Sequence, residues 1–173
     1  MACNSIIEGR EIDCRDSVGG IAEIYITEFV NVSQDAIIAS SGSITALTMN
    51  GGKKFFTYQM EKQNCQFDEK VTVSQENGTV YAEQTLTFNM KKLSAAKRND
   101  LMTLAQFRLL VIVKDNNGLF RLAGQTGGMD MTEGTGSTGK AFGDLNGYTL
   151  SFTGMEPQLA NFLSQAIVTT VTA

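Results

Sequence analysis

The 173-residue chain contains no histidine, and this absence removes several kinds of chemistry at once. Histidine is the commonest general base, the usual base of catalytic triads and the commonest metal ligand. A nucleophilic serine or cysteine would have to rely on a lysine base, and no motif in the chain supports one. We therefore expect no catalytic residues, no metal and no cofactor.

Proline and cysteine are also scarce. Proline occurs once, at Pro157, against 17 glycines, a composition that suits strands joined by tight turns. The cysteines are odd in number and far apart, at Cys3, Cys14 and Cys65, so we expect free thiols and a reducing compartment rather than a disulfide framework. No apolar stretch approaches the length needed to cross a membrane, so we expect no membrane partner.

Basic residues are outnumbered by acidic ones, 14 to 18, which gives a net charge of -4. A surface that grips nucleic acid needs a basic stripe, and this balance argues against one. The acidic balance does not exclude a protein along which nucleic acid moves without binding. The length fits one domain that can bury a hydrophobic core. We therefore expect a single β-rich domain over residues 1–173, with loops at 31–52 and 124–143.

The most informative segment is a long β-hairpin, expected over residues 71–90. Asn77-Gly78 at its turn predicts a type I′ turn with positive φ at both residues. Apolar and polar residues alternate along the second arm, 79–90, which predicts one buried face and one solvent-exposed face. The solvent-exposed face carries the candidate functional residues Thr72, Ser74, Glu83, Thr85, Thr87 and Asn89.

The remaining elements follow from similar patterns. Ser94 is a suitable N-cap for a helix over 95–105, with Leu101, Leu104 and Ala105 on its apolar face. The continuous apolar run Leu109–Val113 predicts a central strand that is buried on both faces. We further expect strands at 21–29, 44–49, 53–60, 119–124, 148–154 and 167–171, a helical turn at 35–38, and a short helix at 156–162.

Three segments superficially match ligand-binding loops. Gly134–Ala141 fits the GxxxxGK pattern of phosphate loops, but Ala141 stands where a Ser or Thr hydroxyl must hold Mg²⁺, and no helix is expected after it. We interpret it as a flexible loop that orders against a neighbour. The segments 115–118 and 144–147 lack the ligand series of a calcium loop, so we interpret both as Asx-rich turns.

Strands as long as those of the hairpin are prone to aggregate at a sheet edge unless they are paired or covered. Lateral pairing between copies would close the sheet into a continuous barrel and remove the edges. The polar face of the hairpin would then line a water-filled channel in a ring of copies. The alternative is an exposed sheet face on a monomer.

The hairpin around Asn77-Gly78, the helix after Ser94, the Leu109–Val113 strand and the segment Gly143–Gly154 together resemble the tail tube proteins of tailed bacteriophages. The resemblance implies a mainly β fold: a β-sandwich or barrel with a long hairpin and one flanking α-helix. It also implies hexameric rings that stack into a tube.

The resemblance further implies a structural subunit of a virion, made in the cytoplasm of the bacterial host. Its partners would be its own copies, other virion proteins, and genomic DNA in transit without specific binding. A neutral or acidic channel lining would let DNA slide, whereas a basic one would stall it. The loops at 31–52 and 124–143 would reach neighbouring copies. A connector ring, a capsid decoration or attachment protein, and an enzyme remain the alternatives.

Overall fold

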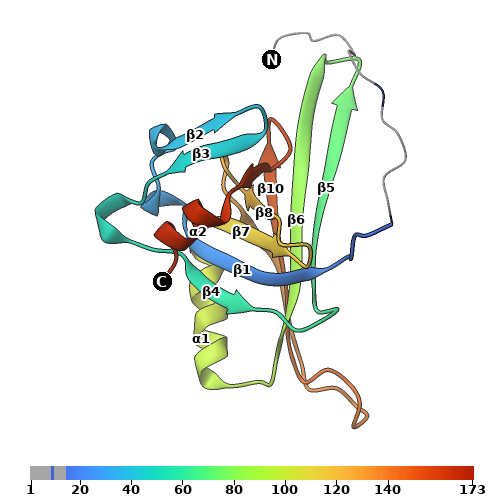
Figure 1. Ribbon diagram of the computed structural model, residues 1–173. Coiled ribbons are helices and arrows are strands. Elements are labelled where there is room, and N and C mark those ends of the chain that lie inside the picture. The colour runs from blue at the N-terminus through green and yellow to red at the C-terminus, as the bar shows by residue number, and fades with distance from the viewer. Residues whose placement is uncertain (1–8, 10–14) are drawn as a thin grey trace.

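The chain folds into two β-sheets that face each other, as the computed structural model of residue 9 and residues 15–173 shows (Figure 1). The seven-stranded sheet has the order β2-β3-β11-β8-β7-β1-β4, and the four-stranded sheet has the order β5-β6-β10-β9. The strands are β1 Ile21–Glu28, β2 Ile37–Ser40, β3 Ser43–Leu47, β4 Phe56–Gln59, β5 Cys65–Ser74, β6 Thr79–Lys91, β7 Leu109–Asp115, β8 Phe120–Ala123, β9 Asp130–Ser137, β10 Gly147–Glu156 and β11 Asn161–Leu163.

Two α-helices are present among the described residues, α1 Ala95–Leu104 and α2 Gln165–Val171. Short 3-10 turns occupy Phe29–Asn31, Gln34–Ala36 and Asn50–Gly52. The expected mainly β sandwich with a flanking helix is confirmed.

The first core cluster lies between the two sheets. Phe88 on β6 and Phe152 on β10 are fully buried and stack with their ring centroids 5.9 Å apart. They pack in one cluster with Ile24 of β1 and Val111 of β7, from the opposite sheet. Aromatic and β-branched side chains suit this position because they fill a pleated interface between sheets.

A second core cluster lies on the other face of the seven-stranded sheet. Leu110 and Ile112 of β7 are fully buried there against Val168 and Val171 of α2. Their neighbours along β7 belong to the first cluster, because successive side chains of a strand point to opposite faces. The prediction that Leu109–Val113 is buried on both faces is therefore confirmed.

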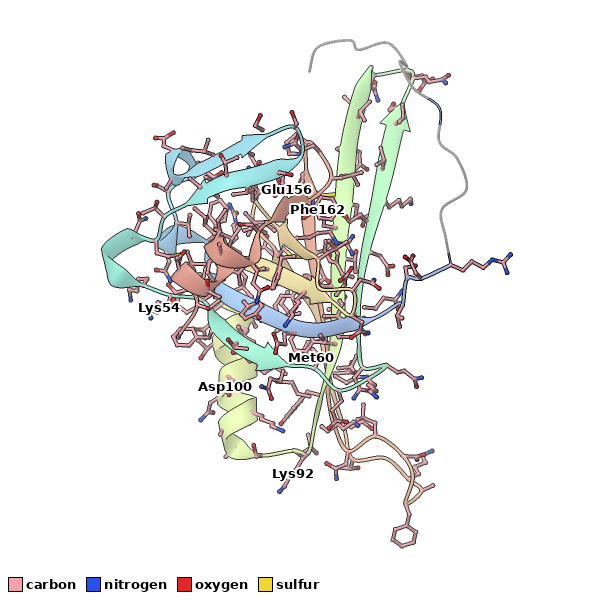
Figure 2. The ribbon with its side chains drawn as sticks, viewed as in Figure 1. Lys54, Met60, Lys92, Asp100, Glu156 and Phe162 are labelled. Carbon is pink, nitrogen blue, oxygen red and sulfur yellow. The ribbon has the colours of Figure 1, made fainter. Side chains whose placement is uncertain are left out.

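The C-terminal expectations were wrong. Residues 156–162 form no helix, because β10 runs through Glu156 and β11 then pairs with β8. The buried Glu156 carboxylate accepts hydrogen bonds from the backbone amides of Thr126 and Gly127 at 2.8–3.0 Å, which fixes the strand end in place (Figure 2). The segment 167–171 is part of helix α2 rather than a strand, because a helix brings Val168 and Val171 onto the second core cluster.

The two segments expected to be loops, 31–52 and 124–143, contain strands, of which only β3 matches a strand expected there, at 44–49. Strand β9 lies within 124–143 and pairs with β10; its glycines weakened the strand signal. Within 31–52, β2 and β3 form a small hairpin after a 3-10 turn at Gln34–Ala36. Parts of both segments therefore belong to the sheets.

Helix α1 begins as expected. The Ser94 side chain accepts a hydrogen bond from the Lys97 amide at 3.3 Å, which satisfies one free donor of the first turn. Leu104 is buried and Leu101 is half-buried against the first core cluster, whereas Ala105 is exposed. The expected apolar face is therefore narrower than the sequence predicted.

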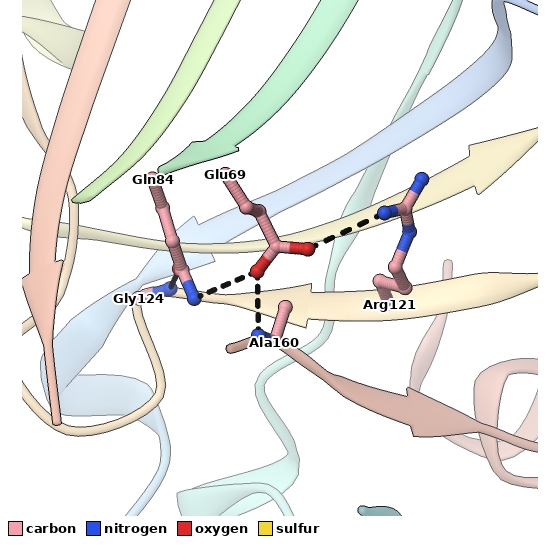
Figure 3. Close-up of polar contacts among 5 residues, drawn as sticks. All are labelled: Glu69, Gln84, Arg121, Gly124 and Ala160. Carbon is pink, nitrogen blue, oxygen red and sulfur yellow. Dashed lines mark hydrogen bonds and ion pairs between the residues drawn. The ribbon is translucent and has the colours of Figure 1, made fainter. Parts of the chain in front are cut away.

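A polar cluster ties the long hairpin to the seven-stranded sheet (Figure 3). One oxygen of the Glu69 carboxylate, on β5, accepts from the Ala160 amide at 2.6 Å and from Gln84 Nε2 at 3.4 Å. The other oxygen pairs with Arg121 of β8 at 3.3 Å. Gln84, 1% exposed, accepts from the Gly124 amide at 2.9 Å. Each polar group that the sheets enclose here therefore has a partner.

We expect Glu69→Ala to lower the free energy of unfolding by about 2 kcal/mol, because Arg121, Gln84 and the Ala160 amide each lose an acceptor in a partly buried place. Urea unfolding of the unassembled protein measures the change. Asp68→Ala, one residue away on the exposed face, is the matched control and should stay within about 0.5 kcal/mol of wild type. Equal losses in the two variants would contradict a supporting role for the cluster.

Candidate functional site

The β5–β6 hairpin projects beyond the body of the protein (Figure 1). Its first arm begins at Cys65 rather than at residue 71, so it is longer than the sequence indicated. Ser74 pairs with Thr79 across a four-residue turn in which Gly78 alone has positive φ, at 61°. The predicted type I′ turn at Asn77-Gly78 is therefore wrong; the longer turn gives Asn77 an ordinary φ and lets its amide bond to Ser74 Oγ at 3.4 Å.

The predicted alternation along β6 is confirmed in its central part. Ala82, Leu86 and Phe88 are buried, but Val80 is exposed because the hairpin tip lies beyond the core. The odd-numbered residues point to the opposite face. Directly paired residues of antiparallel strands share a face, so the register places all six candidate residues on this one side.

We call this outer side of the four-stranded sheet the hydroxyl face. Strands β10 and β9 extend it with residues that sequence reasoning missed, although alternation within 147–156 carried the signal. Its serines and threonines are Thr72, Ser74, Thr79, Thr85, Thr87, Thr132, Thr135, Ser137, Thr149, Ser151 and Thr153.

Neighbouring polar side chains of the hydroxyl face hydrogen-bond to one another. Thr149 Oγ1 donates to Asn89 Oδ1 at 2.7 Å, and Thr87 Oγ1 lies 3.3 Å from Ser151 Oγ. Thr132 and Thr153 hydroxyls are 3.1 Å apart. These cross-strand bonds hold the hydroxyl side chains close to the sheet. The same face also carries the longer, exposed side chains of Tyr81 and Met155.

Charge on the hydroxyl face is mixed, with more acid than base. Asp68 and Glu133 are exposed, and Glu83 is half-buried. Lys70 lies among them, and Lys91 at the far end of β6 is ion-paired with Glu61. The face therefore lacks the row of free cations that phosphate binding requires.

The four-stranded sheet of the described residues ends at β5 on one side and at β9 on the other. Each neighbouring pair in the order β5-β6-β10-β9 is antiparallel, so β5 and β9 run in opposite directions. Both edges are long, ten and eight residues. Such edges are templates for pairing with another chain.

The sheet also carries exposed apolar side chains at both ends of its long axis. Near the hairpin tip, Val71, Val73 and Val80 are 46–61% exposed. The β9–β10 connection, residues 138–146, projects at the opposite end and carries the fully exposed Phe142 (Figure 1). The three valines are neighbours in the hairpin, and contiguous exposed apolar side chains are candidates for a contact surface.

The phosphate-loop-like segment occupies the end of β9 and the connection after it. The amides of Lys140 and Ala141, which would have to face a phosphate, each donate to Asp144 Oδ2 at 2.8 Å. These bonds, first that from Ala141, hold the pKa of the Asp144 carboxyl below its usual range. Strand β10 follows instead of a helix, so this context does not fit a phosphate loop.

A hollow of about 620 Å³ lies beside the start of β5. Its charged lining residues already have partners: Asp115 accepts from the Asn117 and Leu119 amides, and Arg121 pairs with Glu69. Burial raises the pKa of the Cys65 thiol in its wall to about 12, which keeps the thiol neutral. Cys3 and Cys14 lie outside the described residues.

Within residues 15–173, no three His, Cys, Asp or Glu side chains come together as a metal site would require. The Asx turn of Asp115 accounts for the calcium-loop-like segment 115–118. No helix in the described part of the chain has the length and apolar character to cross a membrane.

A comparison of the chain with protein-family models, with curated proteins and with solved structures finds no match.

Proposed function

We propose that the chain is a structural subunit of a bacteriophage virion, the tail tube protein, whose copies form stacked rings around a DNA conduit. The observation that carries the proposal is the four-stranded sheet. One face is polar and weakly acidic, and its two long edges have no strand partner among residues 15–173 and run in opposite directions.

Opposite edge directions favour a ring. Rotation of a copy about the ring axis leaves the up or down sense of every strand unchanged. Strand β9 of one copy then meets β5 of the next copy as an antiparallel pair, which is the pairing used throughout this sheet. Repetition of this contact closes a barrel and leaves no edge exposed.

The hydroxyl face then lines the inside of the barrel, because the other face is covered by the first core cluster. Glu83, Thr85, Thr87 and Asn89 would lie along the channel, with Thr72 and Ser74 from the neighbouring strand. Neutral hydroxyl groups and a small excess of acid give DNA phosphates little to bind, so the polymer can slide.

Stacking of rings would use the two ends of the sheet. Its exposed valines lie at the hairpin tip, and Phe142 lies on the connection at the opposite end. Contact between these ends of successive copies would bury apolar side chains that are exposed in the single chain.

The assembly itself is the first prediction. Negative-stain microscopy over a concentration series, with mass photometry in parallel, should reveal rings and tubes with a central hole. A monomer or trimer at every concentration would contradict self-driven tube formation and favour a capsid decoration or attachment protein. Rings that never stack would favour a connector.

Charge reversal inside the channel is the second prediction. Glu83→Lys adds one cation per copy to the lining, so tubes should form but retain DNA in a salt-dependent manner, and phage should eject their genome more slowly. Asp35→Lys makes the same charge change on a 3-10 turn away from the four-stranded sheet and is the control. Equal DNA retention and ejection in the two variants would argue against a channel position for Glu83.

The third prediction concerns stacking. Val73→Asp places a charge at the hairpin tip, so single rings should accumulate and long tubes should become rare in micrographs, with the unfolding midpoint of the monomer unchanged. Leu119→Asp, at an exposed position in the β7–β8 turn, serves as the control. Tubes of normal length from Val73→Asp would show that the hairpin tip is not a stacking contact.

A further inference from the structure

We propose that β9 of one copy pairs with β5 of the next copy in a single alignment, which sets Lys70 opposite Glu133 of the neighbouring copy. This inference rests on the ring assembly proposed above. It adds the register of the contact and the ion pair that selects this register.

Continuity of the hydroxyl face restricts the possible alignments. A slip of one residue would turn the hydroxyl face of one copy toward the core side of the next. Strand β9 has a bulge at Thr132, where Ser151 pairs with Glu133 and Phe152 with Met131. With this bulge, two alignments keep all of β9 against β5 and keep the face continuous: Glu133 lies opposite Lys70 in one and opposite Thr72 in the other.

Charge distinguishes these two alignments. Glu133 is exposed, and its direct partner within the chain is Ser151, which is uncharged. Lys70 is exposed and forms no ion pair within residues 15–173. The Lys70 alignment brings opposite charges together on one face, which stabilises a cross-strand pair. A shift by two residues the other way would set Glu133 against Asp68 and cause repulsion.

The stagger of a closed barrel favours the same alignment. Within one copy, Glu133 of β9 pairs with Ser151 of β10, Ser151 pairs with Thr87 of β6, and Thr87 pairs with Gln66 of β5. Glu133 and Gln66 therefore lie at the same height on the two edges of the sheet. Pairing of Glu133 with Lys70 instead of Gln66 therefore displaces successive copies by four residues over four strands, since 70 − 66 = 4. One residue per strand is the stagger of barrels whose strands tilt by about 36°. The Thr72 alignment would require a larger stagger.

Glu83 provides the alternative partner for Lys70, because the two residues are directly paired within one chain. They form no ion pair in the structure. A charge-swap series separates the two possibilities, since the exchange of Lys70 with Glu83 preserves only the contact within the chain. Exchange of Lys70 with Glu133 preserves only the contact between copies.

The test measures the critical concentration for tube formation by sedimentation at low salt. We expect Lys70→Glu and Glu133→Lys each to raise this concentration by roughly fivefold, because like charges then face each other across the contact. The double variant Lys70→Glu/Glu133→Lys should return close to wild type. Lys70→Glu/Glu83→Lys should remain as poor as Lys70→Glu.

A zero-length carbodiimide cross-link on wild-type tubes provides a direct readout. We expect an isopeptide bond between Lys70 and Glu133 that joins isotopically labelled and unlabelled copies, present in tubes and absent from the monomer. Circular dichroism and the unfolding midpoint of each variant confirm that the exposed substitutions leave the fold intact.

The outcomes separate the register from the function. Wild-type tubes without recovery in the Lys70–Glu133 exchange, or with recovery in the Lys70–Glu83 exchange, would overturn the register and leave the tube proposal standing. A cross-link from Lys70 to another β9 carboxylate would also overturn it. Failure of the wild-type protein to form rings would overturn both.

Discussion

The period of two along β6 is the constraint on which both sides of the four-stranded sheet depend. It sends Leu86 and Phe88 into the core and Thr85 and Thr87 onto the opposite face. Because β6 is paired on both sides, its register fixes the same division in β5 and β10. A slip of one residue would bury hydroxyls and expose phenyl rings, so core stability and the character of the polar face are set by the same pairing.

Strong local periodicity explains what the sequence could predict. The alternation of β6, the apolar run of β7 and the Ser94 cap each depend on residues close in the chain, and each is confirmed. The face shared by the six candidate residues followed from the same alternation. Their placement along a channel stays a prediction.

The errors occurred where distant contacts decide the local structure. Gly134 and Gly136 weaken the strand signal of the segment that forms β9. This strand is stabilised by its hydrogen bonds to β10, which no local pattern of the sequence shows. The β-branched run 167–171 forms part of α2, and this helix packs Val168 and Val171 into the second core cluster. The start of β5 at Cys65 was not predicted, because the charged side chains within 65–70 do not show a strand pattern. One of these side chains, Glu69, belongs to the polar cluster.

An even number of strands in the smaller sheet has a consequence for the size of any ring. With four antiparallel strands per copy, the first and last strands differ in direction, so every contact between neighbouring copies of the proposed ring is antiparallel. Strand direction alone thus permits closure at any ring number. In the proposed ring, the circumference would therefore be set by the twist and stagger of the sheet. In the proposed ring, a substitution that changes this twist would therefore change the diameter of the channel while every contact between copies stays antiparallel.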